Sequence, residues 1–218
     1  MKSIFLLILV QALIFTENAR ACTAVSLPNA PDAISGYNCD WHQKHGYLLS
    51  NPRSYKKTSL VFGPQEKTLQ WKAKYGSITF NQHGREFPSS GINEKGLSAN
   101  VLWLDSTVHP STDLPKLNEL QWVQYILDTA QTVDEATERV QEFSVSPLLA
   151  KFHYFVCDAQ KECAAFEYLS GRLVIHRQKT MPVATLANDE YSTSLKVLFE
   201  TEGFGGTKPV PLDNSSLS

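Results

Sequence analysis

An apolar leader that ends directly before a cysteine is the feature that most constrains this chain. A nearly unbroken apolar run from Ile4 to Phe15 follows a basic residue, and the triplet Ala-Arg-Ala at 19–21 precedes Cys22. These features are typical of a secretory signal peptide that is cut after its last small residue. The run is too short to span a bilayer, which takes about 20 apolar residues. We therefore predict a signal peptide over 1–21 and an exported domain over 22–218, periplasmic or secreted.

Two other interpretations of the leader stay open. The apolar run could serve as a short N-terminal anchor helix. Lipoprotein signals also end at a cysteine, although they favour an aliphatic and then a small residue where this chain has Ala19 and Arg20. Lipidation of Cys22 would make the chain a lipid-anchored, non-catalytic binding protein.

Composition indicates one ordinary globular domain. The net charge is −2, which does not suggest nucleic-acid binding, and no later run is long enough to cross a membrane once the leader is removed. Cys157 and Cys163 flank the loop DAQKE between two strand-like runs, so in an oxidising compartment we predict a disulfide between them. Cys22 and Cys39 are left over.

Hydrophobic periodicity predicts an α+β fold. Apolar residues at helical spacing indicate a helix over 117–130, and Thr132 with Glu135 forms a capping box for a second helix. A third helix is expected over 192–201. Strands are expected at 22–27, 34–41, 59–62, 68–71, 75–80, 99–104, 152–157, 163–168 and 172–176, and one more should end at Asn188.

The first two strands should form an antiparallel hairpin, because the turn-rich stretch PNAPDA separates them. If the hairpin is centred on Pro31, Cys22 lies opposite Asp40. Cleavage before Cys22 would give one residue both a thiol and a free α-amine, whose pKa values are about 8.5 and about 7.7–8.0. Such a residue can act as nucleophile and as its own base in acyl transfer, with Asp40 holding the amine. The alternative is a small buried core cysteine.

Five segments then occur in a characteristic order: CTAVSL, GYNCDW, HGYLLSNPR, GINEKGLSANVLWL and ATLANDEYSTSL. In order and spacing they resemble the choloylglycine hydrolase family, which includes penicillin V acylases and conjugated bile acid hydrolases and belongs to the N-terminal nucleophile hydrolases. The resemblance implies a four-layer αββα sandwich. It also implies hydrolysis of a linear carbon–nitrogen amide bond in a small-molecule substrate, without a metal or cofactor.

Carried over residue by residue, the resemblance makes Cys22 the nucleophile and Asp40 the aspartate beside its amine. Asn188, in LAND, matches the asparagine that helps to form the oxyanion hole, although it could also serve as a helix N-cap.

The chain departs from the family pattern at three places. Tyr37 replaces an arginine of bile salt hydrolases, and Trp103 replaces a frequent asparagine, so both are candidate substrate-binding residues. Trp103 would offer an aromatic wall to an acyl group. Family members also continue beyond PLDNSSLS into a motif with an active-site arginine, so we expect the fold to be incomplete at the C-terminus. An inactive truncated remnant is therefore a further alternative.

A metal site is the remaining alternative for this region. Cys39, His42 and His45 have C-x2-H-x2-H spacing, but a strand leading into a loop does not place all three on one face, and no second ligand pair follows. We therefore expect no metal site. Whether the chain forms a homo-oligomer is left open.

Overall fold

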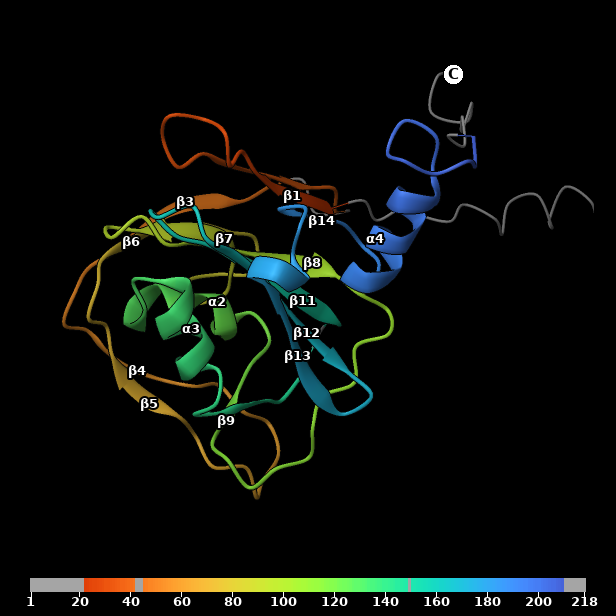
Figure 1. Ribbon diagram of the computed structural model, residues 1–218. Helices are drawn as coiled ribbons and strands as arrows, with labels where there is room; N and C mark the ends of the chain where they lie inside the picture. The colour runs from red at the N-terminus through yellow and green to blue at the C-terminus, as the bar shows by residue number, and fades with distance from the viewer. Residues whose placement is uncertain (1–21, 42–44, 149, 210–218) are drawn as a thin grey trace, which may run out of the picture.

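The computed structural model describes residues 22–41, 45–148 and 150–209. The predicted signal peptide lies outside these ranges, and so does His42. Two antiparallel sheets pack face to face, with α2 and α3 on the outer face of the larger sheet and α4 beside the smaller one (Figure 1). Over the described ranges, no helix has the length and apolar character needed to cross a membrane.

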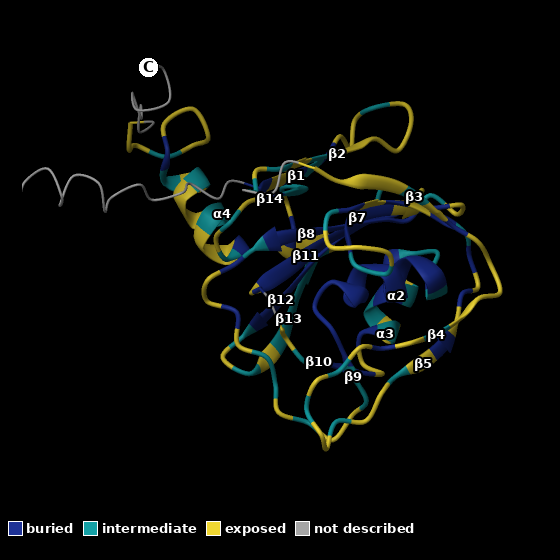
Figure 2. Ribbon diagram, turned by 180° about the vertical axis from the view of Figure 1, so that it is seen from behind, coloured by how far each residue is buried: buried dark blue, intermediate teal, exposed yellow. Residues whose placement is uncertain are grey.

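The larger sheet has seven strands in the order β13-β12-β11-β8-β7-β6-β3. They are β3 (Tyr47–Asn51), β6 (Ser77–Asn81), β7 (Pro88–Asn93), β8 (Ser98–Trp103), β11 (Phe152–Cys157), β12 (Cys163–Leu169) and β13 (Arg172–Arg177). Strand β11 is buried along its whole length because both faces of the sheet are covered there. Strand β6 alternates between buried and exposed residues, with Ile78 and Phe80 on an uncovered face. Figure 2 shows the contrast between the buried β11 and the exposed edge strand β3.

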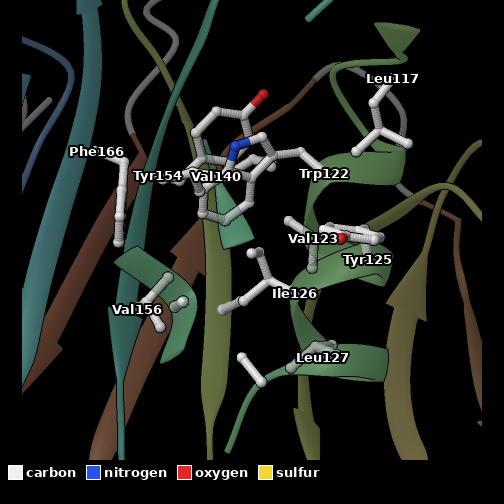
Figure 3. Packing of buried hydrophobic residues seen from close by; sticks show 14 of the residues in the cluster. Leu117, Trp122, Val123, Tyr125, Ile126, Leu127, Val140, Tyr154, Val156 and Phe166 are labelled. Carbon is white, nitrogen blue, oxygen red and sulfur yellow. The ribbon is translucent and has the colours of Figure 1, made fainter. Parts of the chain in front are cut away.

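Helix α2 (Gln121–Thr129) packs on the larger sheet and forms the centre of the main core. Trp122 is fully buried and stacks on Tyr154, with 4.0 Å between ring centroids (Figure 3). The helix begins later than predicted. Residues 116–117 are instead in a strand, and the Asn118 side chain accepts the Leu120 N–H just before the first turn.

Helix α3 (Val133–Arg139) begins at the predicted cap. The Thr132 hydroxyl accepts the Glu135 N–H at 3.1 Å, which satisfies one of the free donors of the first turn. The Glu135 carboxylate accepts the Gln131 N–H at 3.0 Å, one residue before the N-cap. The cap is therefore confirmed, with its reciprocal bond shifted by one residue.

The smaller sheet has the order β14-β1-β2 and is followed by α4 (Tyr191–Glu200). Its strands are β1 (Cys22–Ser26), β2 (Ser35–Cys39) and β14 (Thr185–Leu186). A second buried cluster fills the space between the sheets and includes Ala24, Leu102 and Phe155. The remaining short elements are β4 (Lys56–Thr58), β5 (Gln70–Lys72), β9 (Lys116–Leu117), β10 (Ser144–Val145) and a 3-10 turn, η1 (Gln178–Thr180). The strand predicted over 59–62 is wrong, because the chain leaves the β4–β5 ladder after Thr58 and turns at Gly63.

The predicted register of the first hairpin is also wrong, by one residue. Cys22 lies opposite Cys39, not Asp40. The reason is the turn: the Ala30 N–H bonds to the Leu27 carbonyl, and the Leu27 N–H bonds to the Ile34 carbonyl at 2.9 Å. The loop is therefore centred between residues 30 and 31.

Strands β11 and β12 form another hairpin, with Cys157 directly opposite Cys163. A disulfide links the two residues, as predicted from the loop between them. It ties β11 and β12 together at the end of the two strands that is joined by the turn.

Candidate active site

Cys22 opens β1 and is buried between two neighbouring strands. Only 4% of its surface is exposed. Strand β2 lies on one side of β1, and β14 lies on the other. The Cys22 backbone N–H donates to Oδ1 of Asn188, which follows β14. Two residues that are 166 positions apart, both predicted to be catalytic, are thus in direct contact.

Hydrogen-bond donors surround the Cys22 sulfur. The Cys39 thiol makes the largest contribution, and the backbone N–H groups of Asp40 and Trp103 and the Asn188 amide add to it. Burial opposes ionisation, but these donors outweigh it and lower the pKa of Cys22 to about 6. The same pairing, together with burial, raises the pKa of Cys39. The proton of this thiol pair is therefore held on Cys39, and the negative charge is stabilised on Cys22.

Asn188 is held from two sides. Its Oδ1 accepts the Cys22 N–H, and its Nδ2 donates to the Trp103 carbonyl at 2.8 Å. The N-cap of α4 is Glu190, without a side-chain cap bond, so the alternative role of Asn188 as a helix cap is wrong. The Asn188 side chain instead accepts a hydrogen bond from Cys22, the first residue of β1.

Asp40 takes a different place from the one predicted. Its side chain is exposed, and the group that reaches the Cys22 sulfur is its backbone N–H. The shifted register explains this arrangement, because neighbouring positions along a strand face opposite sides of a sheet.

Trp103 lies at the site as predicted and contributes an aromatic surface. Its ring contacts the Trp41 ring at 5.6 Å and the Phe152 ring at 6.3 Å between centroids. Its Nε1–H donates to the Asp105 carboxylate at 2.7 Å, which fixes the orientation of the indole. These three rings, together with Cys22, line one side of a small cavity.

Tyr37 lines the same cavity, but its hydroxyl makes a hydrogen bond within the protein and does not point to a substrate. It donates to the Val101 carbonyl at 2.7 Å, which ties β2 to β8 across the two sheets. Burial raises the pKa of Tyr37 far above its ordinary value, so the hydroxyl stays protonated. Tyr37 therefore offers its ring, and not a charge, at the position for which the sequence resemblance implied an arginine in bile salt hydrolases.

A larger cavity of about 670 Å³ borders Cys39 between β2 and the uncovered face of β3, β6 and β7. Cys39 and Tyr37 border both cavities, and Phe80 and Ile92 are part of the far wall of the larger one. The volume is within the usual range of small-molecule sites.

Two residues of the site were not predicted. Cys39 was considered only as a metal ligand, because the expected register placed Asp40, and not Cys39, opposite Cys22. Trp41 directly follows Asp40 in the motif GYNCDW and could have been noticed there as an aromatic neighbour.

A buried carboxylate supports the segment after Asn188. Burial alone would raise the pKa of Glu167, but hydrogen bonds from His153, His176 and the Tyr191 N–H lower it to about 2. These bonds measure 3.0, 3.1 and 2.9 Å. The bond to Tyr191 anchors the first residue of α4, three residues after Asn188.

The described part of the chain contains no group of three or more His, Cys, Asp or Glu side chains placed to hold a metal ion. Cys39, the first residue of the proposed C-x2-H-x2-H spacing, faces Cys22 and lies 4.0 Å from the Gln82 side-chain oxygen.

A buried thiolate beside an asparagine amide and an aromatic cavity is equipped for acyl transfer. A family model described as linear amide C-N hydrolases, choloylglycine hydrolase family, matches residues 22–212. The chain belongs to the choloylglycine hydrolase family. The resemblance inferred from the five sequence motifs is thus confirmed.

Related proteins agree with this assignment. A penicillin V acylase from Pectobacterium atrosepticum is 33% identical over 177 residues, which is 72% of this chain and 46% of that protein. The solved structure of penicillin V acylase from Agrobacterium tumefaciens is 28% identical, with a TM-score of 0.70 over 81% of this chain and 55% of that one. The chain therefore spans about half the length of these relatives.

A more distant structure supports the fold alone. A variant of conjugated bile acid hydrolase from Clostridium perfringens is 14% identical, with a TM-score of 0.66 over 83% of this chain and 57% of that one. The predicted fold class, an α+β sandwich of the N-terminal nucleophile hydrolase type, is confirmed by these likenesses.

Proposed function

We propose that this chain hydrolyses a linear carbon–nitrogen amide bond, with Cys22 as an N-terminal nucleophile that signal-peptide cleavage exposes in an exported protein. The observation that carries the proposal is the set of donors around Cys22. Asn188 contacts its backbone nitrogen, and four groups stabilise its sulfur as a thiolate. A structural core cysteine has no need for such surroundings, because a neutral thiol is the more stable form in an apolar core.

Cleavage before Cys22 would turn its amide nitrogen into an α-amine of pKa about 7.7–8.0. Because the pKa of the sulfur is about 6, the proton at pH 7 would lie on the amine and the negative charge on the sulfur. The Asn188 Oδ1, which accepts the Cys22 N–H, would hold that amine in place. The thiolate is then ready to attack without a separate base.

In the first step the Cys22 thiolate attacks the amide carbonyl carbon and forms a carbon–sulfur bond. The Asn188 amide contacts Cys22 and helps to lower the pKa of its thiol, so its Nδ2–H would donate to the carbonyl oxygen as it becomes negative. The α-ammonium protonates the leaving nitrogen, so the carbon–nitrogen bond breaks and an amine departs. Water, deprotonated by the regenerated α-amine, then hydrolyses the thioester and releases the acid.

The aromatic side chains beside Cys22 favour an acyl group with a flat apolar end. The rings of Trp41, Trp103 and Phe152 lie beside Cys22, and Tyr37 offers no positive charge to an acidic substrate. The two similar penicillin V acylases support the same class. We therefore propose aryl-acyl amides as substrates over conjugates with a bulky steroid acid.

The test is to export the full chain, determine its first residue by N-terminal sequencing, and assay it on aryl-acetyl, straight-chain acyl and steroid-acyl amides. We expect a free Cys22 at the N-terminus, turnover of the aryl-acetyl amide, and loss of turnover in Cys22→Ala. Cys22→Ser keeps the size of the side chain and isolates the contribution of the thiolate. Acyl chains on Cys22, or a correctly cut chain without turnover of any amide, would contradict the proposal.

A further inference from the structure

Cys39 is the nearest neighbour of Cys22 across the hairpin, and the ladder places the two residues at close range. Positions along an antiparallel ladder alternate between hydrogen-bonded and non-hydrogen-bonded pairs, and Cα atoms in the second kind approach to about 4.5 Å. The hydrogen bond from the Leu27 N–H to Ile34 marks a hydrogen-bonded pair, and Cys22–Cys39 lies five pairs further on. It is therefore a non-hydrogen-bonded pair. In agreement, the Cys22 N–H points to Asn188.

The same molecule contains a disulfide at the equivalent position of another ladder. The Asp158 N–H bonds to the Glu162 carbonyl at 2.9 Å, which marks a hydrogen-bonded pair at the turn. The next pair is Cys157–Cys163, with Cα atoms 4.1 Å apart, and these two residues are joined. The Cys22–Cys39 pair thus has the backbone relation at which a cross-strand disulfide already exists in this fold.

We propose that Cys22 and Cys39 form a reversible disulfide, which makes the thiol pair a redox modification site that reacts with small disulfides such as oxidised glutathione. The chemistry is independent of the proposed function, and only its effect on turnover depends on that function. While the disulfide is in place, the Cys22 sulfur has no thiolate with which to attack an amide.

The disulfide forms by thiol–disulfide exchange in two steps. The Cys22 thiolate attacks one sulfur of the oxidant, RS–SR, forms a mixed disulfide and releases one RS⁻. Cys39 then gives up its proton, attacks the Cys22 sulfur, forms the Cys22–Cys39 bond and releases the second RS⁻. Two protein thiols are oxidised, one small disulfide is reduced to two thiols, and the reverse exchange restores both cysteines.

The surroundings favour this route. Cys22 is the thiolate of the pair, and the thiolate is the form that attacks a disulfide. Cys39 is partly exposed and borders the cavity of about 670 Å³, so a small disulfide held there reaches the pair from the Cys39 side, next to the buried Cys22. The second step requires little backbone movement, because the two residues already lie opposite each other.

The test uses the full chain, incubated with graded ratios of oxidised to reduced glutathione and then digested without reduction for peptide mapping. We expect a linked Cys22–Cys39 peptide that disappears on reduction, next to the Cys157–Cys163 peptide. In Cys39→Ser, glutathione should remain attached to Cys22. The matched control is the double variant Asn38→Cys/Cys39→Ser, which has the same number of thiols but places the second one on the opposite face of β2. It should form at least tenfold less linked product.

Two results would overturn the inference. One is a wild-type chain whose Cys22 stays glutathionylated, or stays free, at every ratio while Cys39 remains a thiol. The other is a double variant that forms its disulfide as readily as the wild type. Mapping requires no turnover, so an inactive chain with a linked pair contradicts the proposed function alone. An active chain that never forms the link contradicts this inference alone.

Discussion

The ionisation of Cys22 is the most direct quantity to test, because alkylation by a neutral reagent such as iodoacetamide reports the thiolate. With a pKa of about 6, about 90% of Cys22 is ionised at pH 7, against about 3% of an ordinary cysteine of pKa about 8.5. The alkylation rate should therefore rise between about pH 5 and 7 and then level off. An ordinary thiol would still gain rate beyond pH 8.

The midpoint of this curve is more informative than the rate itself. Thiolate nucleophilicity falls with pKa, and a pKa lowered by about 2.5 units costs about tenfold in intrinsic reactivity. That loss cancels most of the roughly 30-fold gain in thiolate at pH 7, so the net acceleration would be only about threefold. A measurement at one pH would miss the effect, whereas a pH series would not.

Replacement of Cys39 tests how much this one neighbour contributes to the lowered pKa of Cys22. Cys39→Ala removes the largest contribution to the lowered pKa, so the midpoint should rise by at least one pH unit, a tenfold loss of thiolate in the rising part of the curve. Cys39→Ser keeps a hydroxyl donor and should raise it less. Peptide mapping assigns the alkylated residue, and circular dichroism checks the fold of each variant. A wild-type midpoint near 8.5, or no change in Cys39→Ala, would refute the reasoning.

Three further substitutions test the support of the site and of the core. In the processed enzyme, Asn188→Ala should lower kcat by about 10²–10³ with little change in KM, as expected for an oxyanion donor, and a rise in KM alone would contradict that role. Gly91→Ala would place a Cβ 2.7 Å from the Ile78 carbonyl and 2.8 Å from the Leu127 side chain, and urea denaturation should show a loss of about 1–3 kcal/mol. The pKa of Glu167 is lowered from 4.5 to about 2, so its contribution to stability is present above 4.5 and is lost as the pH falls towards 2. Glu167→Gln should be less stable at pH 7 and lack that part of the acid transition, and an unchanged acid transition would argue against the stabilising role of the hydrogen bonds to Glu167.

Much of the fold could be predicted because local signals agree with the tertiary structure. Thr132 begins α3 as its capping pattern indicates, and Cys157 and Cys163 meet across a short loop. The contact between Cys22 and Asn188 could be anticipated only from the family resemblance, since nothing local links residues 166 positions apart. The start of α2 was misplaced because Leu117 fits the helical spacing of the apolar residues that follow it, but Lys116 and Leu117 pair with β10.

The hairpin register could not be predicted from its sequence, because two prolines allow more than one centre for the turn. The hydrogen bond from the Ala30 N–H to the Leu27 carbonyl selects a turn with Pro28 at its second position, where proline is favoured. Strand alternation is a weak guide here, since β2 is mostly exposed on both faces. A difference of half a residue in the centre of the turn therefore decides which side chain faces Cys22.

That difference changes the chemistry of the site. A carboxylate opposite the sulfur would add a second negative charge and oppose thiolate formation, whereas the thiol that lies there donates a proton and stabilises the charge. The carboxylate of Asp40 is displaced to the surface, but its backbone N–H remains directed at the sulfur, so the residue supports the same anion through its main chain. Asp40→Asn should therefore change the alkylation midpoint of Cys22 much less than Cys39→Ala does. A larger effect at Asp40 would mean that its carboxylate, and not its main chain, controls the nucleophile.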